Sequence, residues 1–169
     1  MLIVVWPTLR PFWPLSVYLH LYHCQNLLGQ GVSFVAFRLA GFGVAYFADW
    51  QHALRAALGV MFLLTASAHW GKRRPDLMRM VPRIFGAAGM WVTLTGIGEF
   101  LIALGLQIPR AAPAVAALAA GMLVSIFPAN AKAARERLTI GGRPVPGLAA
   151  RLGIQLVFLS ALAATVWPR

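Results

Sequence analysis

The sequence predicts an all-α protein, an integral membrane bundle of four transmembrane helices. Hydrophobic residues make up 60% of the chain and charged residues only 11%, and the mean hydropathy is +0.73, whereas soluble domains carry roughly 25% charged residues. The apolar residues form long runs with few charges, close to the length that crosses a ~30 Å hydrocarbon core. Most basic residues lie between these runs, which is the pattern of cytoplasmic loops.

The first two predicted helices cover residues 50–70 and 84–106. The first follows Asp49, a suitable N-cap, and has a tryptophan at each end, where the amphipathic ring suits the headgroup region. Its Arg55 is expected to extend outward so that the charge reaches water. The second helix contains a single charge, Glu99.

The last two predicted helices cover residues 111–131 and 152–167. The former is an uncharged run rich in Ala, Val and Leu, and the latter is shorter and closes on Trp167. Glycines and prolines in residues 141–147 must turn the chain between them. We expect both runs to span the membrane.

We predict that the chain consists of an N-terminal extension, residues 1–48, and a four-helix domain, residues 49–169. Residues 31–48 are long enough to span, but Arg38 near the middle would cost ~2.5–3.5 kcal/mol. A fifth span and a segment that does not cross are both open. Residues 1–30 mix prolines and aromatic residues without helical periodicity, so we expect them to lie at the interface or to be poorly ordered.

Charge predicts the orientation in the cell membrane. The formal net charge is +11, and the loops at residues 71–83 and 132–151 carry most of it, so both are predicted to be cytoplasmic, facing anionic lipid. Nucleic acid is not a predicted partner, because the basic residues do not line one exposed face.

Glu99 is the sharpest candidate for function, because an ionised carboxylate midway along a spanning helix is costly and must face a partner or a cavity. It could accept a proton or hydrogen-bond a quinone headgroup. The structural alternative is a protonated carboxyl group bonded to a neighbouring hydroxyl or carbonyl, with Thr95 as the local option. His69, Asn130 and Gln155 lie at helix ends on one predicted level. They could form a polar ligand pocket with Glu99, or satisfy helix-end backbone groups.

The first basic loop is a predicted docking surface, formed by Lys72, Arg73, Arg74, Asp76 and Arg79. Asp76 is its only acid, and it is expected to pair with Arg79 one turn on or to cap a short helix over residues 77–81. That segment is amphipathic, so it could act as a lid or meet a soluble partner.

Other chemistries are not indicated. Cys24 is the only cysteine, which excludes an intramolecular disulfide or a thiolate zinc cluster. The sequence has no phosphate-binding loop, zinc-protease helix or nucleophile elbow. We therefore predict no catalytic residues, no metal and no covalently bound cofactor.

From about Asp49 onward the chain resembles the DoxX-like family of small bacterial membrane proteins. The resemblance rests on the order of the motifs Thr65-Ala66-Ser67-Ala68-His69-Trp70, Arg74-Pro75-Asp76-Leu77, Arg79-Met80-Val81-Pro82, Thr93-Leu94-Thr95-Gly96 with Glu99, Phe127-Pro128-Ala129-Asn130, Thr139-Ile140-Gly141-Gly142-Arg143-Pro144 and Gln155-Leu156-Val157-Phe158. Residues 1–48 have no counterpart in that family, and Arg83-Ile84-Phe85-Gly86 replaces its proline-rich step.

The resemblance implies a four-helix membrane domain associated with oxidoreductase systems, whose members include quinone-linked thiosulfate oxidation subunits and partners of soluble antioxidant enzymes. The first hypothesis is therefore a non-catalytic membrane subunit that docks a soluble oxidoreductase and holds a quinone near Glu99. The alternative is a small transporter or permeation module that uses Glu99, which would require a homo-oligomer or a very narrow path. An enzyme acting directly on quinone is a third hypothesis.

Overall fold

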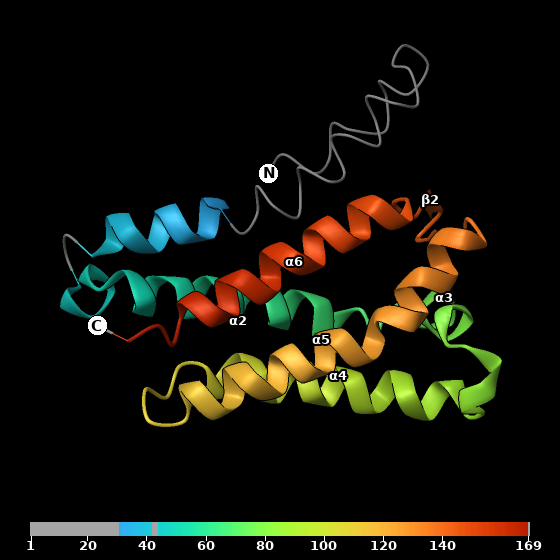
Figure 1. The fold of residues 1–169 in the computed structure, drawn as a ribbon, viewed down its shortest axis with the longest axis horizontal. Helices are drawn as coiled ribbons and strands as arrows, with labels where there is room; N and C mark the ends of the chain where they lie inside the picture. The colour runs from blue at the N-terminus through green and yellow to red at the C-terminus, as the bar shows by residue number, and fades with distance from the viewer. Residues whose placement is uncertain (1–30, 42–43, 169) are drawn as a thin grey trace, which may run out of the picture.

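The computed structural model describes residues 31–41 and 44–168 (Figure 1), and the predictions for residues 1–30 lie outside the described residues. Apart from one short hairpin, the regular structure of the described chain is helical, which confirms the all-α class there. In chain order the elements are a helix at Gly31–Ala40, η2 (Ala45–Ala48), α2 (Trp50–Ser67), α3 (Arg74–Met80), η3 (Arg83–Phe85), α4 (Ala88–Gly105), α5 (Ala112–Arg135), β1 (Thr139–Ile140), β2 (Arg143–Pro144) and α6 (Leu148–Ala164).

Four long helices, α2, α4, α5 and α6, form the bundle, with α3 and the hairpin at one end and the α4–α5 turn at the other (Figure 1). Helix α2 packs on α4, α4 on α5, and α5 on α6. The core lies where Leu58 and Phe62 of α2 meet Leu106, the residue just after α4, and Leu162 of α6. Small residues at the helix contacts let the backbones approach closely, and the buried alanines include Ala53, Ala57, Ala103, Ala112, Ala116 and Ala119.

Local sequence explains where α2 and α4 begin. The carboxylate of Asp49 accepts a hydrogen bond from the backbone N–H of Gln51 at 2.9 Å, which confirms the predicted N-cap of α2. Helix α4 starts at Ala88, later than predicted, because residues 83–85 form a 3₁₀ turn that closes on Gly86. The φ angle of Gly86 is +64°, a conformation that glycine adopts without strain.

The prediction for Arg55 was wrong. Its side chain is only 8% exposed, and its Nε and Nη2 atoms donate to the carbonyl oxygen of Thr165 at 3.3 and 2.7 Å. Thr165 caps the C-terminal end of α6, where backbone carbonyls lack helical partners and carry partial negative charge. The guanidinium therefore binds a buried acceptor on the neighbouring helix and does not extend to water.

The segment considered for a fifth span is interrupted. Its helix ends at Ala40, and the side chain of Arg38 folds back to donate to the carbonyl oxygens of Phe47 and Ala48. Residues 31–48 therefore do not form one continuous helix.

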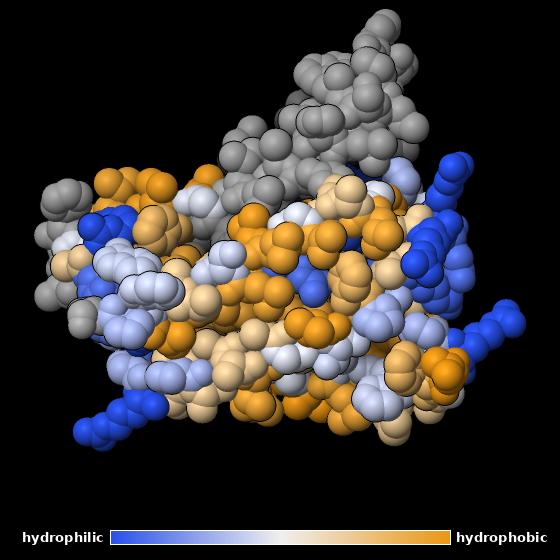
Figure 2. Space-filling model, viewed as in Figure 1, coloured by the Kyte–Doolittle hydropathy of each residue, from blue (hydrophilic) through white to orange (hydrophobic). Residues whose placement is uncertain are grey.

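Within the described part of the chain, two helices, α4 and α5, are long and apolar enough to cross a membrane by length and composition, and α6 is a shorter apolar helix. Large apolar side chains on these helices are exposed, and Figure 2 shows such side chains across the visible face, with strongly hydrophilic ones toward both ends. They include Leu94, Ile97, Leu101, Leu104, Leu118, Val124, Leu152 and Leu156. An exposed apolar surface of this kind marks a face that meets lipid or another protein.

Candidate ligand-binding cavity

A cavity of about 1190 Å³ lies among α2, α4, α5 and α6, near the end that carries α3 and the hairpin. Its volume exceeds the ~300–1,000 Å³ usual for small-molecule pockets. All four residues predicted to bind a ligand, Glu99, His69, Asn130 and Gln155, line it. Much of the remaining lining is apolar, including Leu77, Met80, Met122 and Phe158. The cavity is therefore an apolar space with a few polar groups.

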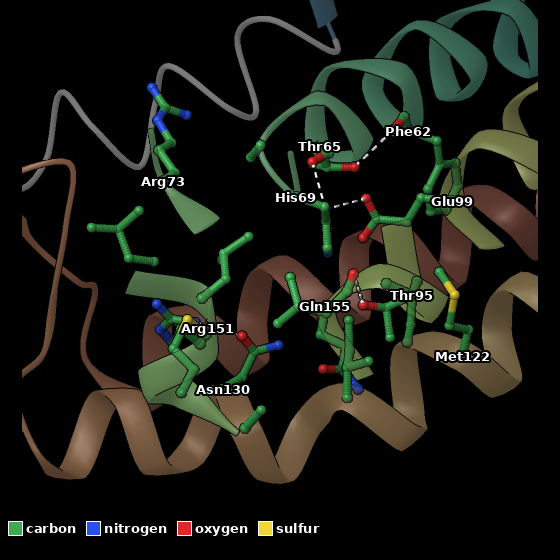
Figure 3. A pocket seen from close by; sticks show the side chains of 18 of the residues that line it. Phe62, Thr65, His69, Arg73, Thr95, Glu99, Met122, Asn130, Arg151 and Gln155 are labelled. Atoms are coloured by element: carbon green, nitrogen blue, oxygen red, sulfur yellow. Dashed lines mark hydrogen bonds and ion pairs between the residues drawn. The ribbon is translucent and has the colours of Figure 1, made fainter. Parts of the chain in front are cut away.

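Glu99 and His69 face each other across the α2–α4 contact (Figure 3). The side chains come from the middle of α4 and the residues just after α2, and Nδ1 of His69 lies 3.7 Å from Oε2 of Glu99. Their exposed fractions are 7% for Glu99 and 8% for His69. Within the part of the chain that the structure describes, the buried Oε2 atom has no hydrogen-bond partner, which is a costly arrangement for a polar atom.

Gly96 makes this close approach possible. It lies one turn before Glu99 on α4, and a Cβ atom at this position would lie 2.7 Å from Cβ of His69 and 2.9 Å from the ring of Trp70. Only glycine leaves room for the His69 side chain against the α4 backbone. The Gly96-x-x-Glu99 spacing therefore positions both members of the pair.

Hydrogen bonds orient the groups around Glu99. Nδ1 of His69 lies 3.0 Å from the carbonyl oxygen of Thr65, and because a carbonyl only accepts, Nδ1 carries the proton. The hydroxyl of Thr65 lies within reach of the Glu99 carboxyl group, but it donates to the carbonyl oxygen of Phe62 at 3.1 Å. The hydroxyl of Thr95 donates to carbonyl oxygens of its own helix. The local Thr95–Glu99 bond considered from the sequence is therefore not formed.

The part of the cavity nearest the hairpin has cationic walls. Arg73, Arg143 and Arg151 line it there, from the loop after α2, the hairpin and α6. Nη1 of Arg151 donates to Oδ1 of Asn130 at 2.6 Å, so the predicted ligand residue Asn130 is held by α6. These arginines belong to the basic loops seen in the sequence, but their position in the cavity was not predictable, because only the fold brings the loops together.

The residues of the predicted docking surface differ in role. Arg74 points inward, and it donates to the carbonyl oxygens of His69 and Gly89 and to the hydroxyl of Thr93 at 2.9–3.0 Å. It therefore ties the end of α2 to α4. Lys72 and Arg73 are exposed, and Arg73 also reaches the cavity.

Asp76 joins the two basic loops. Its carboxylate pairs with Arg79, as predicted, and it also accepts a hydrogen bond from the backbone N–H of Gly141 at 2.7 Å. The hydrogen bond from Gly141 has the largest effect on the Asp76 carboxylate, followed by the bond from Arg79. Both bonds lower the pKa of Asp76 below its ordinary value of 3.8. Nζ of Lys132 donates to carbonyl oxygens of Arg79 and Val81. Helix α3 is thus fastened to both the hairpin and α5, beside the cavity.

Metal binding has no support among the described residues, where no group of three or more His, Cys, Asp or Glu side chains could hold an ion.

Fold and site together define a helical bundle with a buried carboxylate in an amphipathic cavity. The chain belongs to the family described as Domain of unknown function (DUF8561), whose model matches residues 58–166. No curated protein and no solved structure matches the chain. The matched range contains the cavity residues from Val60 to Phe158, including Glu99 and His69, whereas Val32 and Ser33, which also line the cavity, lie outside it. The DoxX-like resemblance stays a prediction.

Proposed function

We propose that this chain is an integral membrane protein of four transmembrane helices that serves as a non-catalytic subunit of an oxidoreductase system and binds a quinone-class molecule in its cavity. The observation that carries the proposal is the buried carboxyl group of Glu99, which faces His69 in an amphipathic cavity while its Oε2 atom lacks a partner among the described residues. A polar group placed in this way is typical of a binding site inside a membrane bundle.

The exposed apolar surfaces of α4, α5 and α6 support the membrane part of the proposal. Helices α2 and α4 each have 18 residues and α6 has 17, lengths of about 26 Å at ~1.5 Å per residue, which approach the hydrocarbon thickness. The burial of Arg55 removes an objection to a spanning α2, because its charge is bound within the bundle. The basic end, with α3 and the hairpin, would face the cytoplasm.

The cavity supports an amphipathic ligand. Apolar side chains such as Met122 and Phe158 suit a hydrophobic tail, and the few polar groups near Glu99 suit an oxygen-bearing ring. A quinone combines both parts. Its headgroup would bind between α2 and α4, with the tail along the apolar walls.

The cytoplasmic end supports docking of a soluble oxidoreductase. Lys72, Arg73 and Arg79 are exposed there, and the bonds of Asp76 and Lys132 hold α3 in place. A fixed basic surface would attract an acidic partner. Lipid covers the apolar faces in this proposal, and a homo-oligomer would use the same faces.

Copurification in mild detergent tests the proposal. The full-length chain, Glu99→Gln and Glu136→Gln as a matched control would be isolated, with mass spectrometry of bound proteins and extraction of bound quinone. Glu136 is exposed at the end of α5 and does not line the cavity. We expect quinone and a soluble oxidoreductase with the native chain and Glu136→Gln, and loss of quinone alone with Glu99→Gln.

Absence of both quinone and oxidoreductase from the native preparation would contradict the proposal. In that case, flux in liposomes that requires Glu99 and no partner would favour the transporter alternative.

A further inference from the structure

Most hydroxyl protons near Glu99 already form hydrogen bonds with backbone carbonyl oxygens. The hydroxyls of Thr65 and Thr95 donate to Phe62 and Trp91 carbonyl oxygens at 3.1 and 2.8 Å. The hydroxyl of Ser125, across the cavity on α5, donates to Gly121 at 2.8 Å. These hydroxyls can therefore only accept further hydrogen bonds, through their oxygen lone pairs.

His69 follows the same pattern. Its Nδ1 proton is bound by the Thr65 carbonyl oxygen, so in the neutral ring Nε2 is an acceptor. Gln155 on α6 adds an amide that can both donate and accept, and the arginine donors lie toward the hairpin. The surroundings of Glu99 are therefore rich in acceptors.

The Oε2 atom of Glu99 lacks a hydrogen-bond donor among the described residues. This atom is buried, and His69 is too far, at 3.7 Å, to supply a hydrogen bond. Figure 3 shows the carboxyl group beside His69 among the side chains that line the cavity. Whether the group is ionised or protonated, at least one oxygen accepts only.

We propose that the ligand presents a hydroxyl group that donates to Glu99, so that the cavity prefers the hydroquinone form of a quinone to the oxidised form. A hydroxyl both donates and accepts, whereas a quinone carbonyl only accepts and would leave the acceptors around Glu99 without a donor. Sites built to hydrogen-bond a hydroxyl discriminate strongly against analogues that lack it. This inference rests on the proposed function, because it takes the ligand to be of the quinone class.

A matched pair of probes tests the preference. A decyl-tailed benzoquinone and the same molecule reduced to its hydroquinone, kept under argon, would be measured by equilibrium partitioning into nanodiscs that contain the full-length protein, against protein-free nanodiscs. The signal from protein-free nanodiscs is subtracted for each probe, which removes the contribution of partitioning into lipid, and the identical tails make the two probes comparable. We expect the hydroquinone to bind at least about tenfold more tightly than the quinone.

The Glu99→Gln variant separates the acceptor from the shape of the site. Its amide replaces the acceptor-only oxygen with a group that also donates, so hydroquinone binding should weaken to about the level of quinone binding and the ratio should fall to about one. This weakening agrees with the loss of bound quinone expected when Glu99→Gln is purified. Glu136→Gln should keep the native ratio. Thermal unfolding of each variant shows whether it is folded, and Thr65→Val serves as a second variant that alters a neighbouring group without changing the carboxyl group.

The outcomes distinguish the inference from the proposed function. Equal binding of both probes by the native protein, abolished by loss of Glu99, would overturn the hydroxyl preference and leave the quinone site in place. A preference that persists in Glu99→Gln would overturn the assignment to Glu99. Binding of neither probe above the protein-free nanodiscs would overturn the inference together with the quinone assignment.

Discussion

The guanidinium of Arg55 donates twice to the carbonyl oxygen of Thr165, and so joins the first turns of α2 to the C-terminal end of α6. Gln51 reinforces this junction by donating to the carbonyl oxygens of Ala164 and Trp167 at 3.3 and 3.0 Å. Gln107, at the end of α4, donates to the backbone carbonyl of Arg55 at 3.0 Å. Polar side chains therefore fasten the end of the bundle opposite the hairpin.

We expect Arg55→Met to destabilise the protein by about 2–3 kcal/mol, because the Thr165 carbonyl oxygen would lose a charged donor in a buried position. The midpoint of thermal unfolding in detergent measures the effect. Arg110→Met is the matched control, since Arg110 is exposed in the α4–α5 turn. Equal midpoints for the two variants would show that the buried contact contributes nothing.

Gly96→Ala should destabilise the contact between α2 and α4 by about 1–3 kcal/mol. The new methyl group would lie within 2.9 Å of His69 and Trp70, so the His69 ring must shift away from Glu99. Ligand binding should weaken along with stability. Gly153→Ala on α6 is the control, because its Cβ would meet open space. A Gly96→Ala protein with native unfolding and native binding would refute the packing role.

The contact between Asp76 and Gly141 should depend on pH. The folded-state pKa of Asp76 is lowered from 3.8, so its contribution is fully present above the unfolded value and is lost as the pH falls through the folded value. We expect the Gly141 amide to be protected from hydrogen exchange at pH 6 in the native protein and less protected in Asp76→Asn. The difference should vanish as the pH falls well below 3.8. A difference that is constant with pH would contradict the role of the carboxylate.

The membrane orientation predicts accessibility on the two sides. In a Cys24→Ser background, single cysteines at Lys72 and Arg110 would be treated with a membrane-impermeant maleimide. We expect Arg110→Cys to react in intact cells and Lys72→Cys only after permeabilisation, because α4 separates the two positions. Labelling of both from the same side would contradict a spanning α4.

The local features of α2 and α3 were predictable because they depend on neighbours in the chain. The N-cap Asp49 and the Asp76–Arg79 pair are both confirmed, since each joins residues two or three positions apart. The start of α4 was misplaced because apolar character cannot distinguish a 3₁₀ turn over residues 83–85 from a first helical turn. The Gly86 that follows was the available signal.

The candidate site was only partly predictable from the sequence. Glu99 is conspicuous as the single charge in an apolar run, and His69, Asn130 and Gln155, which were predicted to share one level, do line one cavity with it. Their predicted position at helix ends was wrong for Asn130, which lies inside α5, and for Gln155, which lies in the middle of α6. The role of Gly96 and the inward position of Arg143 depend on contacts with other elements. Sequence spacing alone carries no information on those contacts.

The sequence by itself determined the helical class, the apolar runs, the two basic loops and the isolated carboxylate, because composition and periodicity express the solvent that each segment prefers. Only the tertiary structure decided which partners the charged groups find. The Arg55 side chain points inward because the C-terminal end of α6 lies beside it. Glu99 faces His69 rather than Thr95 because α4 packs closely against the end of α2 at Gly96. A buried charge takes the nearest suitable group in space, and that distance is set by helix packing.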